Sequence, residues 1–201
     1  MRKGNIYTVY FRRKRDGFTN YRRRLKILAS NKPRLVVRKS LKNIQANIVE
    51  YNKNGDIVRV TCHSAILKKL GWNYGTGNLP AAYLVGFMLG AKAKAANFKD
   101  AVLDIGINKS VKGSRAYAVL AGALDAGLKV PYGENILPDK DRLSGKHIAA
   151  YAQKLREGES LKKQFGSYIK SNADPYNIVK NFEEVKEKIM KIEDFQDAKK
   201  A

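Results

Sequence analysis

Acidic residues are scarce in this chain. Its 201 residues include 40 Lys and Arg against 18 Asp and Glu, which gives a formal net charge of +22 at pH 7. The imbalance is greatest at the beginning, where residues 1–42 hold fifteen Lys and Arg and a single acid, Asp16. Because like charges repel, a segment this basic is typical of proteins that bind an external polyanion. That polyanion is either nucleic acid or an acidic membrane.

Cysteine and long apolar segments are also nearly absent. Cys62 is the single cysteine, which excludes an internal disulfide and favours a reducing compartment. The longest apolar run, Ala81–Ala91, is too short to span a bilayer, and Met1–Phe11 lacks the apolar region of a signal peptide. We therefore expect a cytoplasmic protein without a membrane partner.

Residue patterns typical of a catalytic or metal site are lacking as well. His63 and His147 have no metal-ligand spacing to each other or to Cys62, so we expect structural roles for both. Asp104 ends a predicted buried strand, where a nuclease could place a carboxylate. A two-metal nuclease needs several converging acids, however, and most other acids of residues 43–150, Asp56 among them, look peripheral. We expect no catalytic residue, no metal and no cofactor.

The stretch from Arg12 to Asn43 is the strongest indication of function. It reads RRKRDGFTNYRRRLKILASNKPRLVVRKSLKN and contains the basic clusters Arg12–Arg15, Arg22–Lys26 and Arg34–Lys42. A membrane-binding segment would interleave its charges with a broad apolar face, which this stretch lacks. Arginine side chains match phosphates in a bidentate geometry and stack on bases. The composition therefore indicates nucleic acid, and RNA before DNA.

Two aromatic residues in this stretch leave two alternatives open. Phe18 and Tyr21 are free to stack on unpaired bases. They also share one face of a helix predicted over residues 19–28 with Leu25 and Leu28, and this favours packing of that face against the domain. The basic residues of the same helix are expected to point away from the domain: Arg22, Arg23 and Lys26.

The order of the periodic segments predicts an α/β fold with a mixed sheet. Residues 1–17 show no period and are expected to form an extended arm. Three strands with one apolar face follow, and Asn54-Gly55 is typical of a two-residue hairpin turn. They predict an antiparallel three-stranded meander: Arg34–Ser40, Ile44–Tyr51 and Ile57–His63. Two helices, a strand and a helix are expected next: Ser64–Leu70, Leu79–Ala96, Ala101–Ile105 and Ser114–Ala126.

The rest of the chain predicts a helical extension. A loop or linker over residues 132–143 precedes helices over Ser144–Arg156 and Ser160–Lys170. A final helix carries an apolar stripe that either packs on its own domain or binds a partner: Ile178, Phe182, Val185, Ile189 and Ile192. We expect three parts: a basic N-terminal arm and short helix (1–30), an α/β RNA-binding core (31–131), and a linker with a helical C-terminal extension (132–201).

A second candidate for anion binding precedes the helix at Ser114. The segment Asn108–Arg115 reads NKSVKGSR. Gly113 lets the backbone approach a ligand closely, Ser114 can cap the helix, and free amides with nearby bases can form an anion pocket. An ordinary helix start is the alternative. The segment lacks the spacing of a Walker loop, so nucleotide hydrolysis is not indicated.

Four blocks of the chain, in this order and spacing, resemble one family. They read RRKRDGFTNYRRRLKIL over 12–28, KPRLVVRKSLKNIQAN over 32–47, NLPAAYLVG over 78–86, and LDIG, KGSR and ALDAGLKVP within 103–131. The chain is similar by these motifs to family L-eighteen of the large-subunit ribosomal proteins, in its archaeal–eukaryotic form. The resemblance covers about residues 5–155.

This resemblance implies an α/β protein of the central protuberance that clamps 5S rRNA, joins it to the large-subunit rRNA and lies beside a neighbouring 5S-binding ribosomal protein. It implies no catalytic residue. Together with the basic stretch and the anion pocket, it gives the predicted RNA-binding residues: Arg12, Arg13, Lys14, Arg15, Asn20, Tyr21, Arg22, Arg23, Arg24, Lys26, Arg34, Arg38, Lys39, Ser40, Lys42, Asn43, Lys109, Lys112, Gly113, Ser114 and Arg115. The alternatives are a non-ribosomal RNA-binding assembly or regulatory factor, and a ribonuclease H-like RNA-processing enzyme that would require Asp104.

Overall fold

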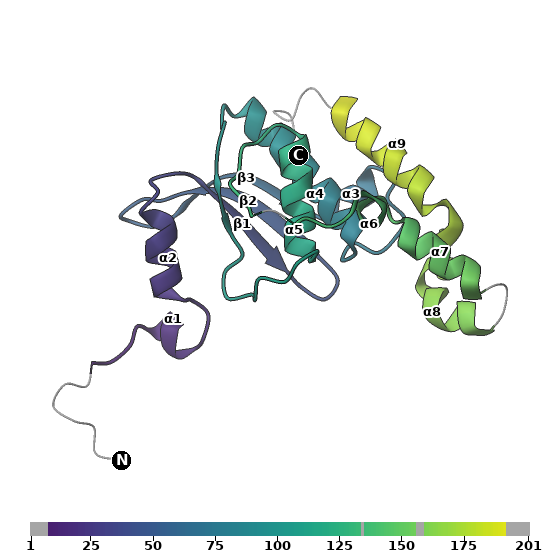
Figure 1. The fold of residues 1–201 in the computed structure, drawn as a ribbon, viewed down its shortest axis with the longest axis horizontal. Helices are drawn as coiled ribbons and strands as arrows, with labels where there is room; N and C mark the ends of the chain where they lie inside the picture. The colour runs from purple at the N-terminus through teal and green to yellow at the C-terminus, as the bar shows by residue number, and fades with distance from the viewer. Residues whose placement is uncertain (1–7, 134, 156–158, 192–201) are drawn as a thin grey trace, which may run out of the picture.

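A four-stranded mixed sheet lies at the centre of the molecule (Figure 1). The computed structural model describes residues 8–133, 135–155 and 159–191. Strands β1 (Arg34–Lys39), β2 (Ile44–Glu50) and β3 (Ile57–His63) form the antiparallel meander, and β4 (Val102–Asp104) pairs in parallel with β1. The order β3-β2-β1-β4 confirms the predicted mixed sheet.

The meander forms because its apolar residues alternate. Ile44, Ala46 and Ile48 of β2 are fully buried on one face of the sheet. The hairpin between β2 and β3 is present, but its loop spans residues 51–56 rather than the two residues predicted, since the pairing stops at Glu50 and Ile57. The predicted alternation fails in β1, where Arg34 and Val36 on the opposite face are buried as well.

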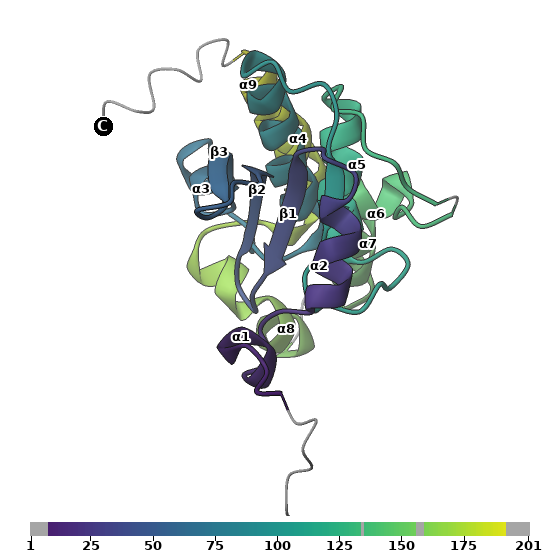
Figure 2. The same ribbon diagram turned by 90° about the vertical axis from the view of Figure 1, so that its left-hand side faces the viewer.

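Helices α4 (Leu79–Ala95) and α5 (Arg115–Asp125) lie close together against one face of the sheet (Figure 2). Their backbones touch at two glycines. A Cβ atom on Gly86 would collide with the main chain of Val119, and one on Gly122 would collide with the main chain of Tyr83. Between β3 and α4 lies the short helix α3 (Ile66–Lys69), and an isolated parallel bridge joins Asp100 to Lys129.

The C-terminal helices form the end of the molecule that is opposite the N-terminal helices (Figure 1). They are α6 (Lys140–Ser144), α7 (Lys146–Leu155), α8 (Glu159–Lys170), the 3-10 turn η1 (Pro175–Asn177) and α9 (Ile178–Lys191). The apolar stripe of α9 packs into the core that also contains α4, which favours self-packing over partner binding. Its last predicted member, Ile192, lies outside the described residues. Helix α6 falls in a segment predicted to be a loop.

Two short helices, α1 (Arg12–Arg15) and α2 (Tyr21–Leu28), begin the described chain. The extended arm predicted through Gly17 is wrong over α1. The Phe11 carbonyl accepts from the amides of Lys14 and Arg15, and Gly17 ends the turn with a φ of +71°. Asn20 caps the start of α2: its side chain accepts from the amide of Arg23.

Candidate nucleic-acid interface

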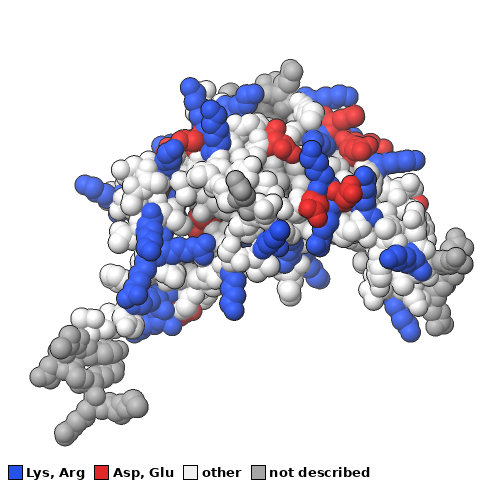
Figure 3. Space-filling view, in the orientation of Figure 1, with Lys and Arg blue, Asp and Glu red and all other residues white. Residues whose placement is uncertain are grey.

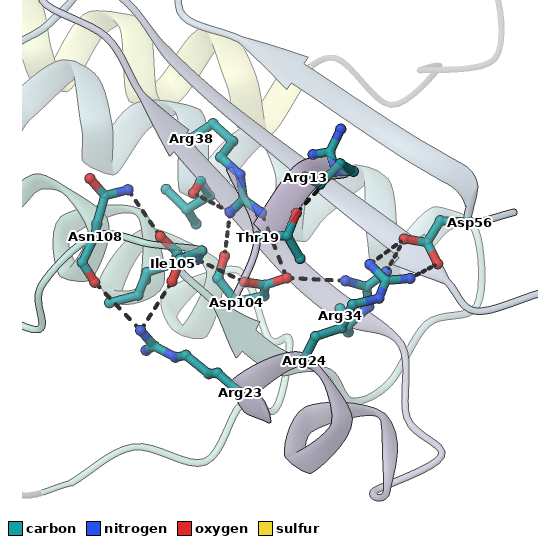
Figure 4. Close-up of polar contacts among 12 residues, drawn as sticks. Arg13, Thr19, Arg23, Arg24, Arg34, Arg38, Asp56, Asp104, Ile105 and Asn108 are labelled. Atoms are coloured by element: carbon teal, nitrogen blue, oxygen red, sulfur yellow. Dashed lines mark hydrogen bonds and ion pairs between the residues drawn. The ribbon is translucent and has the colours of Figure 1, made fainter. Parts of the chain in front are cut away.

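Helix α2 contacts the sheet through arginines rather than through its apolar residues. Phe18 and Leu25, predicted to pack inward, are 64% and 71% exposed. Arg23 and Arg24 turn toward the body of the protein instead (Figure 4). The predicted packing is therefore wrong for Phe18 and Leu25, whereas Tyr21 and Leu28 are half-buried. The prediction that Arg23 points away from the domain is wrong as well.

Arg24 is the first member of a chain of ion pairs. Its guanidinium forms a bidentate pair with the Asp56 carboxylate, with N–O distances of 2.9 and 2.8 Å. Asp56 Oδ2, which accepts from Arg24, also accepts from Arg34 at 2.5 Å, and Arg34 donates to Asp104 at 3.1 Å. Arg34 is only 3% exposed. Two carboxylates therefore hold a buried arginine and anchor α2 on the sheet.

The protonation equilibria of this network agree with its geometry. The hydrogen bond to Asp56 raises the pKa of Arg24 above its ordinary value. Burial alone would raise the pKa of Asp56, but the hydrogen bonds from Arg24 and Arg34 outweigh burial and lower that pKa below its ordinary value. Both partners are thus held in their charged forms at neutral pH.

Two further arginines bind the loop that follows β4. Arg23 donates to the carbonyls of Gly106 at 3.1 Å and Asn108 at 3.4 Å. Arg38 donates to the Asp104 carbonyl at 3.0 Å and lies 3.7 Å from an Asp104 carboxylate oxygen. This loop approaches the Arg38 guanidinium so closely that a Cβ atom on Gly106 would lie 2.9 Å from Arg38 Cζ. Helix α2, β1 and the loop therefore form one unit.

The turn between β1 and β2 uses its polar side chains internally. Ser40 Oγ donates to the Asn43 carbonyl, and Asn43 Oδ1 accepts from Thr76 at 3.0 Å. Arg115 donates to the carbonyls of Ser40 and Gly77, at 3.1 and 2.8 Å. Ser40, Asn43 and Arg115 were predicted to bind RNA, and in the structure they hold this turn in place.

The predicted anion pocket at α5 has fewer free amides than expected. The Gly113 amide donates to the Ile136 carbonyl and the Ser114 amide to the Val111 carbonyl. Ser114 occupies the N-cap position, but its side chain makes no capping hydrogen bond. Exposed Lys109 and Lys112 remain as the cations of this segment, so side chains rather than a backbone nest define it.

Apart from Tyr21, Gly113 and Ser114, the predicted RNA-binding residues fall into two sets. The side chains of one set form hydrogen bonds or ion pairs within the protein: Asn20, Arg23, Arg24, Arg34, Arg38, Ser40, Asn43 and Arg115. The other set consists of exposed cations that have no carboxylate partner in the part of the chain that the structure describes: Arg12, Arg13, Lys14, Arg15, Arg22, Lys26, Lys39, Lys42, Lys109 and Lys112. Tyr21 is half-buried, with its ring centroid 5.2 Å from that of Phe11.

Positive charge crowds the end of the molecule that carries α1 and α2 (Figure 3). The red atoms on this face gather mainly toward the C-terminal helices. Sequence reasoning found the cations at this end but missed Asp56, the acid that orders them. No local signal marks Asp56, since its two arginine partners lie 32 and 22 residues earlier in the chain.

The acids and histidines do not assemble into a catalytic or metal-binding group within the described ranges. The Asp104 carboxylate is paired with Arg34 and accepts from the Gly106 amide at 2.8 Å. His63 Nδ1 accepts from the Ala65 amide, as a structural role requires. Among the described residues, no group of three or more His, Cys, Asp or Glu side chains is placed so that it could hold a metal ion. Within the same ranges, every helix is too short or too polar to cross a membrane.

Comparison with known proteins gives the family. Residues 5–100 match the family described as "Ribosomal large subunit proteins 60S L5, and 50S L18". The chain is 47% identical over 187 residues to the large ribosomal subunit protein uL18 of Methanococcus maripaludis, an alignment that covers 92% of this chain and 97% of that protein. The resemblance inferred from the four sequence blocks is thereby confirmed, together with the cytoplasmic location that a ribosomal protein has. The chain belongs to the uL18 family of large ribosomal subunit proteins.

Proposed function

We propose that this constituent of the large ribosomal subunit binds 5S rRNA and attaches it to the large-subunit rRNA at the central protuberance, beside a neighbouring 5S-binding ribosomal protein. The role is structural rather than catalytic. The observation that carries the proposal is the set of exposed cations on α1 and α2, which have no carboxylate partner among the described residues and lie where the family motifs are densest. A polyanion is the partner that such a surface needs.

In this mechanism, binding begins with the neutralisation of phosphates. Exposed cations on α1 and α2 displace counterions from the RNA, and each phosphate contact adds to the salt dependence of affinity. The arginine–carboxylate network holds α2 in one orientation before RNA arrives, so little ordering entropy is lost at that helix on binding. Selectivity then comes from the shape of the RNA rather than from base edges.

The test is a titration of the full-length protein with 5S rRNA and with a tRNA of comparable length, at several salt concentrations. We expect a preference for 5S rRNA that persists at about 0.2 M salt, above the background of counterion release. Equal affinities that fall together as salt rises would contradict specific recognition of 5S rRNA.

A variant links this preference to α2. Arg22→Ala with Lys26→Ala removes two exposed cations one helical turn apart, which repel each other in the free protein. We expect a fold that is unchanged by circular dichroism, weaker binding of 5S rRNA, and a log–log salt slope that is smaller by about 1.5. The matched control removes two exposed lysines of the C-terminal helices, Lys154→Ala with Lys180→Ala. An identical loss in both double variants would mean that only net charge matters.

A further inference from the structure

A cleft of about 650 Å³ lies between helix α2 and the sheet. Its walls come from α1, α2, β1, the β2–β3 loop and the loop after β4, so segments far apart in the sequence build it together. Its volume is within the range of small-ligand sites. A second hollow of about 470 Å³ adjoins it and shares Thr19, Asn20, Tyr21 and Ile107 with it.

The cleft carries more positive charge than its acids neutralise. Five guanidiniums, of Arg13, Arg23, Arg24, Arg34 and Arg38, line it or pair with its acids, against two carboxylates, of Asp56 and Asp104. The excess is three positive charges. The two carboxylates serve Arg24, Arg34 and, at longer range, Arg38. Arg23 donates to carbonyls, and Arg13 donates to the hydroxyl of Thr19 at 3.0 Å (Figure 4). Such an excess favours an anionic occupant.

The cleft also has an apolar wall that is largely exposed. Phe18 is 64% exposed and Ile107 is 61% exposed, and both line the cleft. A phosphate or an acidic peptide would use the arginines but would leave this wall unused. An occupant that is both anionic and planar uses both, because a base stacks on an aromatic ring while its phosphate pairs with guanidinium groups.

We propose that this cleft receives an unpaired nucleotide of RNA, with its base against Phe18 and Ile107 and its phosphate at Arg13 and Arg38. The proposal rests on the RNA-binding function proposed above. The adjoining hollow, which Lys14 and Arg22 also line, receives the next phosphate of the same strand. The site recognises an RNA residue that is extruded from its helix, by stacking on its base rather than by contacts to the base edges.

The test compares two apolar residues that are equally exposed. Phe18→Ala removes the stacking wall, and Leu25→Ala removes a side chain of similar exposure on α2 that lines neither hollow. Binding is measured with an unstructured RNA of about ten nucleotides, a length within the range of single-strand sites. We expect Phe18→Ala to weaken binding by about 5- to 150-fold, Phe18→Trp to preserve it, and Leu25→Ala to leave it unchanged. Equal affinities of the Phe18→Ala and Leu25→Ala variants would overturn the proposal.

Two competitors distinguish the source of the ligand. Millimolar AMP should fail to displace the RNA from the wild-type protein, since a lone nucleotide lacks the adjacent phosphate. Displacement by AMP would make the cleft a mononucleotide site instead. Polyglutamate that competes equally well against the wild-type and Phe18→Ala proteins would make it a general anion site.

Chemical probing of the 5S rRNA complex separates this proposal from the proposed function. The wild-type protein should protect one or a few unpaired bases, and Phe18→Ala should expose them again while other protections remain. Absence of any 5S rRNA preference, with binding of the short RNA that still depends on Phe18, would contradict the proposed function and support the cleft. The opposite pattern is a preference for 5S rRNA with the same bases protected by the wild-type and Phe18→Ala proteins. It would contradict the proposal that the cleft binds a nucleotide and leave the proposed function intact.

Discussion

At the scale of single residues, we expect loss of the Asp56 charge to weaken RNA binding, although charge counting alone predicts tighter binding. Loss of a negative charge should strengthen the attraction of this protein, with its net charge of +22, for RNA. Asp56→Asn also removes the partner of Arg24 and leaves the buried Arg34 with Asp104 alone. We expect severalfold weaker RNA binding and a loss of about 1–3 kcal/mol in unfolding free energy, measured by RNA titration and urea unfolding.

Asp16→Asn is the matched control for this prediction. Asp16 is an exposed acid beside the same basic surface, and its carboxylate has no partner among the described residues. Its loss changes the charge and not the anchoring of α2, so we expect equal or slightly tighter RNA binding. If Asp56→Asn also tightens binding, the orientation of α2 is irrelevant to recognition.

At the scale of secondary structure elements, the close approach of α4 and α5 leaves no room for a larger residue at their contact, and we expect such a residue to lower stability. Gly86→Ala places a methyl group against the backbone of Val119, where no flexible side chain can give way. We expect a loss of at least about 2 kcal/mol in unfolding free energy, measured by urea titration. Gly166→Ala in α8 serves as the comparison, because nothing lies within 4 Å of its added Cβ, and it should leave stability unchanged or slightly higher. Equal effects of both would contradict the tight helix contact.

The elements also show where sequence reasoning succeeds and where it fails. Period-two alternation predicted β1, β2 and β3, and a short apolar run predicted β4. A long segment that is apolar nearly all round predicted α4, and helical spacing of apolar residues predicted α5 and α9. Helices α1 (RRKR) and α6 (KDRLS) were missed, because they contain no apolar residue and one apolar residue respectively and so show no amphipathic pattern. Helix α2 was predicted, but its docking face was not, because ion pairs with Asp56 overrode the apolar pattern.

At the scale of the whole molecule, the buried thiol of Cys62 and the phenol of Tyr74 make the free energy of unfolding depend on pH in the alkaline range. Burial raises the pKa of the Cys62 thiol from 9.0 to about 12, and burial, with Asp174 nearby, raises the pKa of Tyr74 from 10.0 to about 12. A raised pKa in the folded state stabilises it fully below the pKa of the unfolded chain, and this stability is lost as pH rises toward the folded value. We therefore expect the free energy of unfolding to fall between about pH 9 and pH 12.

Cys62→Ala isolates one contribution to this decline. The variant lacks the group that begins to ionise near pH 9 in the unfolded chain, so its decline should begin near pH 10, where Tyr74 ionises in the unfolded chain. Urea unfolding of both proteins over the same pH series measures the difference. Identical pH profiles would mean that the thiol is not protected by the fold.

Because the residues that anchor α2 lie far behind it in the sequence, they are synthesised after it. Asp56 follows Arg24 by 32 residues, and Gly106 follows Arg23 by 83. At synthesis rates of about 5–20 residues per second, the first anchor appears about 2–6 s after α2 and the second about 4–17 s after it. During those seconds a helix with four basic residues exists in the nascent chain without the acid that orients it, so it meets the polyanions of the cell before its own fold can direct it.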